Sequence, residues 1–132
     1  MVPKWHVLNL YNMAKTINRV EKEIDANGQA VGRIATQAVT FLRGKHRPDF
    51  APNADAGDFV IITNASKVKF TGRKLEQKDY YHHTLYPGGL KRTPMKRVVV
   101  ADPTEVIRKA IYGMLPKNKL RNEMMKRLTI KK

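Results

Sequence analysis

The clearest hydrophobic pattern in the chain predicts a helix between residues 31 and 42. Apolar side chains recur there at steps of three, one, three and four residues: Val31, Ile34, Ala35, Ala38 and Leu42. This spacing places an apolar stripe along one side of a helix, where it can pack against a core. Before the helix, residues 25–28 predict a tight turn, since Asn-Gly tolerates the positive φ angles of a reversal. After it, Gly44 is the expected C-cap.

Four other segments have the patterns of β-strands. Residues 59–62 form a continuous β-branched and aromatic run, which is typical of a strand buried on both faces. Val68 and Phe70 alternate with lysines, which predicts a strand with one basic face in water. Residues 20–26 and 128–130 are the first and last predicted strands. Strand and helix patterns alternate along the chain, which indicates an α/β domain with helices packed on a small sheet.

Helix signals dominate the last third of the chain. Asp102 is a preferred N-cap residue, Pro103 suits the first turn, and Glu105 lies three residues after the cap. Gly113 is expected to end this helix in a positive-φ conformation. Asn118 is expected to cap a short final helix that leads into the last strand.

The charge of the chain points to a polyanionic partner. The 132 residues carry 26 Lys and Arg against 11 acids, a net charge of +15, and 42% of them are apolar, enough for one domain. Such an excess repels itself unless a polyanion neutralises it, so nucleic acid is the first candidate and an anionic membrane surface the second. The longest apolar runs have four residues, far short of the ~20 of a membrane helix. The cations are spread over several loops, which favours a folded polyanion.

The N-terminus leaves three alternatives open. Trp5 and its apolar neighbours could form a short arm, the protein could start at Met13, or an organellar presequence could be cleaved. No secretory signal is visible. The absence of cysteine excludes disulfides and thiolate metal sites.

Two stretches combine cations with aromatic or imidazole rings. The first follows the helix of residues 31–42. The basic side chains there could bind RNA, or they could simply be solvated charges that the negative end of the helix dipole stabilises. The second spans residues 78–97, where rings beside a Pro-Gly-Gly turn could stack on unpaired bases. As a strand, this stretch would point Tyr80, His82 and Thr84 to one side and the residues between them to the other, and one of these sets is expected to be buried.

Catalytic and metal chemistry find little support in the sequence. One potential set of metal ligands occurs: His46, Asp49, Asp55 and Asp58. These lack a recognised ligand spacing, so turn formation and local charge balance are the favoured roles. His82 and His83 are adjacent and would point to opposite faces of a strand. A nuclease that uses one of them is the third-ranked function.

Five motifs in a fixed order resemble one known family. The most specific is Ala-Ile-Tyr-Gly-Met-Leu-Pro-Lys-Asn at residues 110–118. The others lie at residues 25–33, 42–48, 57–62 and 80–90, the last being a Tyr/His…Tyr-Pro-Gly-Gly loop. Together they resemble the family of the thirteenth protein of the large ribosomal subunit, in its bacterial and organellar form. Three features depart from it: Trp5 lies far upstream, Arg121 replaces a common glycine, and the chain ends at Lys132 where many relatives continue.

The resemblance implies a three-layer α/β/α fold with a central, mostly parallel four-stranded sheet. It also implies a structural constituent of the large ribosomal subunit that supports assembly, with no catalysis and no cofactor. The implied partners are large-subunit rRNA of the 23S type and neighbouring large-subunit ribosomal proteins, with neither a membrane nor a small-molecule substrate. We expect residues 1–18 to be an extension and residues 19–132 a single domain, working in the ribosome of the cytoplasm or, alternatively, of an organelle.

The candidate RNA-binding residues are cations for phosphates and rings for stacking or hydrogen bonding. The cations are Arg43, Lys45, Arg47, Arg73, Lys74, Lys91, Arg92, Lys117, Lys119 and Arg121. The rings are His46, Tyr81, His83 and Tyr86. The alternative function is a regulatory module that binds messenger RNA outside the ribosome.

Overall fold

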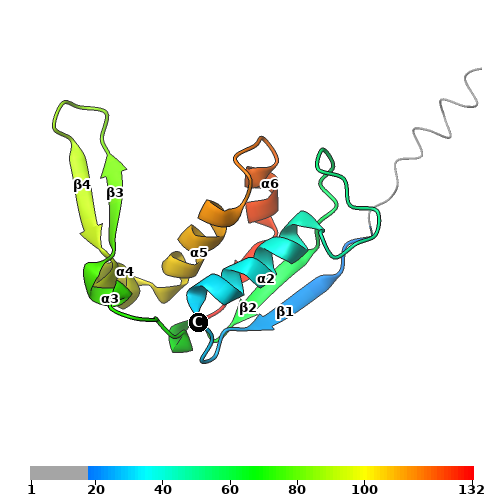
Figure 1. Cartoon of the computed structure of the whole chain (residues 1–132), viewed down its shortest axis with the longest axis horizontal. Coiled ribbons are helices and arrows are strands. Elements are labelled where there is room, and N and C mark those ends of the chain that lie inside the picture. The colour runs from blue at the N-terminus through cyan, green and yellow to red at the C-terminus, as the bar shows by residue number, and fades with distance from the viewer. Residues whose placement is uncertain (1–17) are drawn as a thin grey trace, which may run out of the picture.

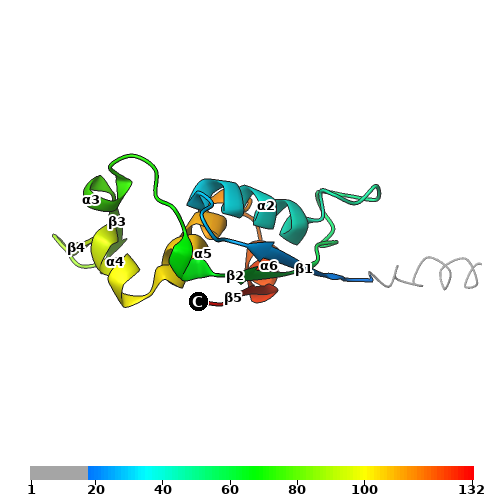
Figure 2. The same cartoon turned by 90° about the horizontal axis from the view of Figure 1, so that it is seen from below.

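The computed structural model describes residues 18–132, and a parallel three-stranded sheet lies at its centre. The strands β1 (Glu21–Asp25), β2 (Phe59–Thr63) and β5 (Leu128–Ile130) lie in the order β1-β2-β5. The helices α2 (Val31–Arg43) and α5 (Pro103–Met114) pack side by side over it (Figures 1 and 2). The mixed α/β class is therefore confirmed. The alternatives for Trp5 and Met13 concern residues outside those described.

The sheet is covered on one face, which corrects the expected layering. On the covered face, the side chains of all three strands are buried or half-buried, among them Ile24, Val60 and Leu128. The other face carries Glu21 and Glu23 beside Phe59, which is 41% exposed. Within residues 18–132 the sheet thus has three strands and helices on one side only, instead of four strands between two helix layers. The prediction that residues 59–62 are buried on both faces is wrong for the same reason.

The expected strand around Val68 and Phe70 is reduced to a single bridge. Ala65–Lys67 forms the short 3-10 helix η1, and Lys69 then pairs with Ala30 in one isolated parallel bridge. The backbone of Lys69 donates to the Gln29 carbonyl at 2.9 Å. The prediction of a strand here is therefore wrong: Lys67 belongs to η1, and the single bridge at Lys69 does not extend into a ladder.

The helix α2 forms as its sequence pattern predicts. Its side chains Ile34, Ala35, Ala38 and Leu42 are fully buried, so the apolar stripe is the core-facing side. Gly44 is the C-cap with φ of 79°, and its amide donates to the Phe41 carbonyl at 3.1 Å. A Cβ at Gly44 would lie 2.8 Å from the Ala56 carbonyl oxygen, so the position needs glycine for its conformation and for space.

A hairpin extends from the body on a small helical base. The base consists of α3 (Lys74–Gln77) and α4 (Met95–Ala101), and the hairpin of β3 (Asp79–His83) and β4 (Leu90–Pro94), paired antiparallel. Met95 is buried, and its amide donates to the Lys78 carbonyl at 2.8 Å, which closes the base. Figure 1 shows the hairpin standing away from the central sheet.

Of the three helix caps predicted in the C-terminal part of the chain, one is confirmed and two are wrong. The Asp102 carboxylate accepts the Thr104 amide at 3.1 Å at the start of α5, as predicted. Gly113 does not end this helix, because α5 continues to Met114 and the φ of Gly113 is not positive. Asn118 does not cap the last helix either: α6 (Arg121–Lys126) begins three residues later without a side-chain cap.

Candidate nucleic-acid interface

The first group of predicted residues lies on the last residue of α2 and the loop that leads to β2, residues 43–58, which we call the α2–β2 loop. The Arg43 guanidinium lies over the Phe50 ring, 5.5 Å from its centroid. Lys45 follows the glycine cap and is exposed, and among the described residues its ammonium group has no ion-pair partner. Lys45 is therefore the cation that this loop presents most openly to solvent.

The next two residues, His46 and Arg47, contact one buried carboxylate. Asp58 is 1% exposed and accepts a hydrogen bond from the Arg47 guanidinium and one from the Val20 amide at 3.1 Å. His46 places its Nε2 2.8 Å from the same carboxylate. Arg47 also donates to the Asn18 carbonyl at 2.6 Å. Arg47 and His46 thus join the loop to the start of β1.

The charge on Asp58 is maintained by these contacts. Burial by itself raises the pKa of its carboxyl group, but the hydrogen bonds from Val20 and Arg47 and the nearby charges of Arg47 and His46 outweigh it. The pKa therefore lies below its ordinary value of 3.8, and the carboxylate is ionised at neutral pH.

A second carboxylate holds an arginine that the sequence reasoning missed. Both oxygens of Asp55 lie 2.5 Å from the guanidinium of Arg127, which is 7% exposed. Arg127 also donates to the Leu42 carbonyl at 3.1 Å, which connects the C-terminal strand to α2. Gly57 lies so close to the Leu42 carbonyl that a Cβ has no room. The sequence pointed to this contact only through the three aspartates of the loop, for which it indicated a role in local charge balance.

The second group lies on the hairpin, whose large side chains are exposed. Tyr81 is 63% exposed, Tyr86 75% and Leu85 92%. Leu85 has a φ of 69°, and its amide donates to Nδ1 of His83 at 3.0 Å. Lys91 is exposed on β4. The hairpin tip therefore presents apolar and aromatic surface to solvent.

The expected burial of one face of this hairpin is not observed. Tyr80 and Thr84 are half-buried, but His82 on the same side is exposed. The hairpin projects beyond the core, so neither side is covered as a whole. Its one ion pair among the described residues joins Arg92 to Asp79 at 2.6 Å, and the Arg92 side chain remains 66% exposed.

The third group of predicted residues is the pair Arg73 and Lys74, which is exposed at the start of α3. Lys74 lines a hollow of about 890 Å³ between α2, α3 and α5. In the wall of this hollow, the Tyr80 ring is contacted by the ammonium groups of Lys78 and Lys109, at 5.4 and 4.6 Å from its centroid. Burial raises the pKa of the Tyr80 phenol.

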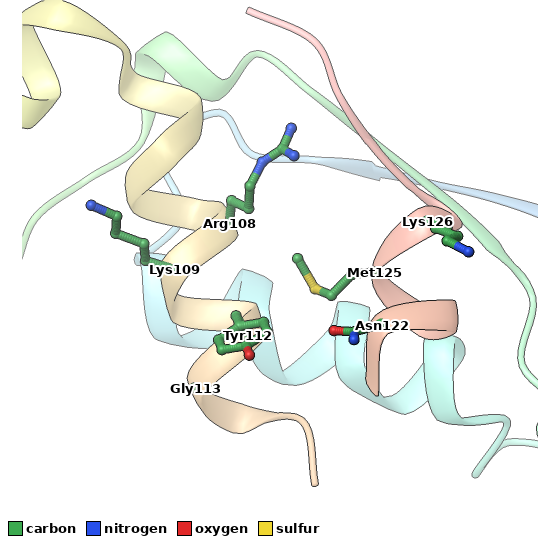
Figure 3. A pocket seen from close by; sticks show the side chains of 7 residues that line it. All are labelled: Arg108, Lys109, Tyr112, Gly113, Asn122, Met125 and Lys126. Carbon is green, nitrogen blue, oxygen red and sulfur yellow. The ribbon is translucent and has the colours of Figure 1, made fainter. Parts of the chain in front are cut away.

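The fourth group lies between α5 and α6. Lys117 and Lys119 are exposed on the connecting loop. Arg121 is half-buried, with its guanidinium 4.0 Å from the centroid of the Tyr112 ring and a hydrogen bond of 2.9 Å to the Leu115 carbonyl. A hollow of about 560 Å³ lies beside this contact, between α5 and α6 (Figure 3).

The groups do not converge on one pocket, but three of their loops extend to the same side of the molecule. In the view of Figure 1 the hairpin tip, the α5–α6 loop and the α2–β2 loop all project upward from the body. This arrangement can meet an extended partner along one side, and it is unlike a cleft that encloses a small molecule.

Two alternatives were tested on the described part of the chain. Across residues 18–132, no helix has both the length and the apolar character needed to cross a membrane. Over the same residues, no three carboxylate, imidazole or thiol side chains group in a way that could hold a metal ion.

Comparison with known proteins gives one consistent family. The model of the family described as ribosomal protein L13 matches residues 19–131. A protein of Chloroflexus aurantiacus named large ribosomal subunit protein uL13 is 51% identical over 107 residues, which cover 81% of this chain and 74% of that protein. The protein of the same name from Thermus thermophilus is 50% identical over 107 residues, covering 81% of this chain and 76% of its own length. That of Nitratidesulfovibrio vulgaris is 46% identical over 116 residues, with coverage of 88% and 81%.

Proposed function

Because this chain belongs to the ribosomal protein L13 family, we propose that it is a structural constituent of the large ribosomal subunit that binds large-subunit rRNA. The named relatives are proteins of that subunit, so the ribosome is its place of action and catalysis is not its role. In finer detail, we propose that the RNA is of the 23S type, that neighbouring large-subunit proteins contact the chain, and that binding supports assembly of the subunit. Residues 19–132 act as one domain, with residues 1–18 as an extension.

The observation that carries the RNA contact is the distribution of unpaired charge. Four cations lie on the hairpin and the two loops that project to one side and have no carboxylate partner among the described residues: Lys45, Lys91, Lys117 and Lys119. In the α2–β2 loop the buried Asp58 engages His46 and Arg47 instead. A folded RNA offers phosphates along such an extended side, and each phosphate contact releases counterions. Exposed rings on the hairpin suit unpaired bases, which stack on aromatic side chains.

The predicted residues divide into two roles in this proposal. Exposed side chains contact RNA directly: Lys45, Arg73, Lys74, Tyr81, His83, Tyr86, Lys91, Arg92, Lys117 and Lys119. Side chains with partners inside the chain act by holding their loops in place: Arg43, His46, Arg47 and Arg121. The second group contributes to RNA affinity mainly through the position of its neighbours.

Binding to large-subunit rRNA can be tested with the purified chain. Filter binding should show tighter binding to a transcript of the organism's large-subunit rRNA than to its small-subunit rRNA. The logarithm of the affinity should fall linearly with the logarithm of the salt concentration, by roughly 0.9 per phosphate contacted on a duplex. Equal affinity for both transcripts would contradict the specificity.

Placement in the subunit needs a measurement in cells. A tagged chain should cosediment with large subunits in a sucrose gradient, including with their assembly precursors. A chain that stays wholly at the top of the gradient would contradict a ribosomal role and would favour a regulator of messenger RNA.

A further inference from the structure

Gly113 is a glycine that nothing in the described fold requires. It lies within α5, with no positive φ, and a Cβ built on it would meet no described atom within 4 Å. Glycine weakens a helix interior relative to alanine, because it loses more conformational freedom on folding. No contact within the described fold gives a steric reason for glycine at Gly113, as is also the case at Gly32. Gly113 differs from Gly32 in that it borders a second hollow, where a molecule that approaches the helix backbone closely would exclude a side chain.

The space in front of Gly113 is a hollow of nucleotide scale. Its volume is about 560 Å³, within the roughly 300–1,000 Å³ of small-molecule sites. Figure 3 shows Tyr112 on α5 facing the side chains of Asn122 and Met125, which point across from α6. Gly113 also lines the larger hollow on α2, α3 and α5, so it separates two concave surfaces.

The charged side chains that line the smaller hollow are all cations. Lys109 and Lys126 point away from its centre on opposite sides (Figure 3), and Arg108 completes the set. Two of the three have exposed acidic partners on their own helices: Glu105 lies 3.7 Å from Arg108, and Glu123 lies 2.8 Å from Lys126. Exposed pairs of this kind are weak, so a phosphate can replace the carboxylate.

The floor of the hollow suits a nucleobase. Tyr112 is 44% exposed, and the Arg121 guanidinium stacks on its ring at 4.0 Å from the centroid. A base laid on Tyr112 would extend this stack, and the Met125 thioether would meet the apolar edge of the base. The Asn122 amide offers both a donor and an acceptor for polar atoms of the base.

We propose that this hollow receives one unpaired nucleotide of the RNA, with the sugar–phosphate chain passing over the backbone at Gly113 and the base against Tyr112. This inference rests on the proposed binding of large-subunit rRNA. It assigns a defined contact to residues 108–126 that charge alone does not supply, because stacking and close backbone approach do not depend on net charge.

Gly113→Ala separates this role from a structural one. A methyl group there should leave the urea midpoint unchanged or raise it, because alanine favours a helix. The same methyl group should lower affinity for the large-subunit rRNA transcript about five- to tenfold. Gly32→Ala is the matched control: Gly32 is also helical, with no described atom near a built Cβ, and it lines the larger hollow together with Gly113 but does not line the smaller one. It should change affinity less than twofold.

Tyr112 supplies an independent test. Tyr112→Ala should lower affinity about five- to a hundredfold, the range for loss of one stacked base. Tyr112→Phe keeps the ring and should bind like the wild type. With a transcript that contains 4-thiouridine, ultraviolet light should crosslink the full chain within residues 108–126.

The outcomes distinguish the two proposals. A wild-type chain that does not prefer the large-subunit transcript refutes the proposed function. If the wild type binds but Gly113→Ala binds equally well, unfolds at lower urea, or loses no more affinity than Gly32→Ala, the nucleotide site is refuted alone. Failure of Tyr112→Phe to retain affinity also refutes it.

Discussion

The α2–β2 loop (residues 43–58) and the β3–β4 hairpin (residues 79–94) share a composition of cations and rings, but they relate to the body in opposite ways. In the loop, Asp58 binds Arg47 and His46, and Asp55 binds Arg127 from the C-terminal end of the chain. In the hairpin, Asp79 pairs with Arg92, and large side chains such as Leu85 are exposed. The loop is held to the body by buried charge, and the hairpin is largely outside it.

The difference shows that a cluster of cations has no single meaning. Where the chain places a desolvated carboxylate beside a cation, the pair fixes the fold, and loss of either member is costly. Where cations and rings project into solvent with no partner in the described chain, they can bind another molecule. Asp55 and Asp58 therefore identify the cations that hold the α2–β2 loop to the body.

The largest expected effect is the loss of the Asp58 carboxylate. Asp58→Ala leaves Arg47 and His46 without their buried partner, and we expect it to lower the free energy of unfolding by about 3 kcal/mol. Urea denaturation followed by circular dichroism measures this. Asp79→Ala in the hairpin is the comparison: the Asp79 side chain is 8% exposed, but its partner Arg92 is 66% exposed and stays hydrated when the carboxylate is removed. It should therefore cost less than Asp58→Ala, which leaves a cation unpaired in a more buried place. Equal losses in the two variants would remove the distinction between loop and hairpin.

The hairpin should show the reverse behaviour. Tyr86→Ala removes a ring that is 75% exposed, so the free energy of unfolding should change by less than about 0.5 kcal/mol. Affinity for the rRNA transcript should fall by about 1–3 kcal/mol if the ring stacks on a base. Filter binding and urea denaturation of the same preparation provide both values. A large loss of stability without a loss of affinity would give the hairpin a structural role.

Two neighbouring cations sharpen the comparison within the loop. Lys45→Ala should reduce the slope of log affinity against log salt by roughly 0.9 for one duplex phosphate, with stability unchanged. Arg47→Ala should cost about 1–3 kcal/mol of stability, because Asp58 loses a charge-assisted hydrogen bond, and should change the salt slope less than Lys45→Ala does. If the two effects are interchanged, our assignment of the two residues is wrong.

The smallest effect is a dependence of stability on pH. The pKa of Asp58 is lower in the folded chain than its ordinary value of 3.8, so its ionised form stabilises the fold. This contribution is fully present above about pH 4 and is lost as the pH falls through the folded-state pKa. Urea midpoints should therefore decrease below pH 4 in the wild type. In Asp58→Asn the decrease should be shallower, and an identical decrease would exclude Asp58 as a source.

Local signals in the sequence predicted several elements correctly. The apolar spacing of α2, the glycine cap at Gly44 and the Asp102 cap of α5 each depend on neighbours within a few residues. Gly113 shows the limit of this reasoning: a glycine near the end of a helical pattern is a common cap, but here α5 includes it. Its role depends on what approaches the helix, which no local pattern encodes.

The predicted interface stays a prediction, and the structure adds contacts of its residues that the sequence could not supply. The sequence identified Arg47 and His46 as basic residues after a helix, but it could not identify Asp58 as their partner, 11 residues from Arg47. Arg127 lies 72 residues from Asp55 and was not singled out at all. Charge pairing across such separations depends on the packed fold.

The sequence by itself determined the class of the domain, its main helices, the family and the need for a polyanionic partner, because periodicity, caps, motifs and net charge are local or additive properties. The tertiary structure decided that the sheet has three strands with helices on one face, and which cations are bound by Asp55 and Asp58. It also placed Gly113 between two hollows. These features arise only when segments that are distant in the sequence pack together and exclude water. The packing then decides which carboxylate contacts which cation and which surfaces surround a glycine.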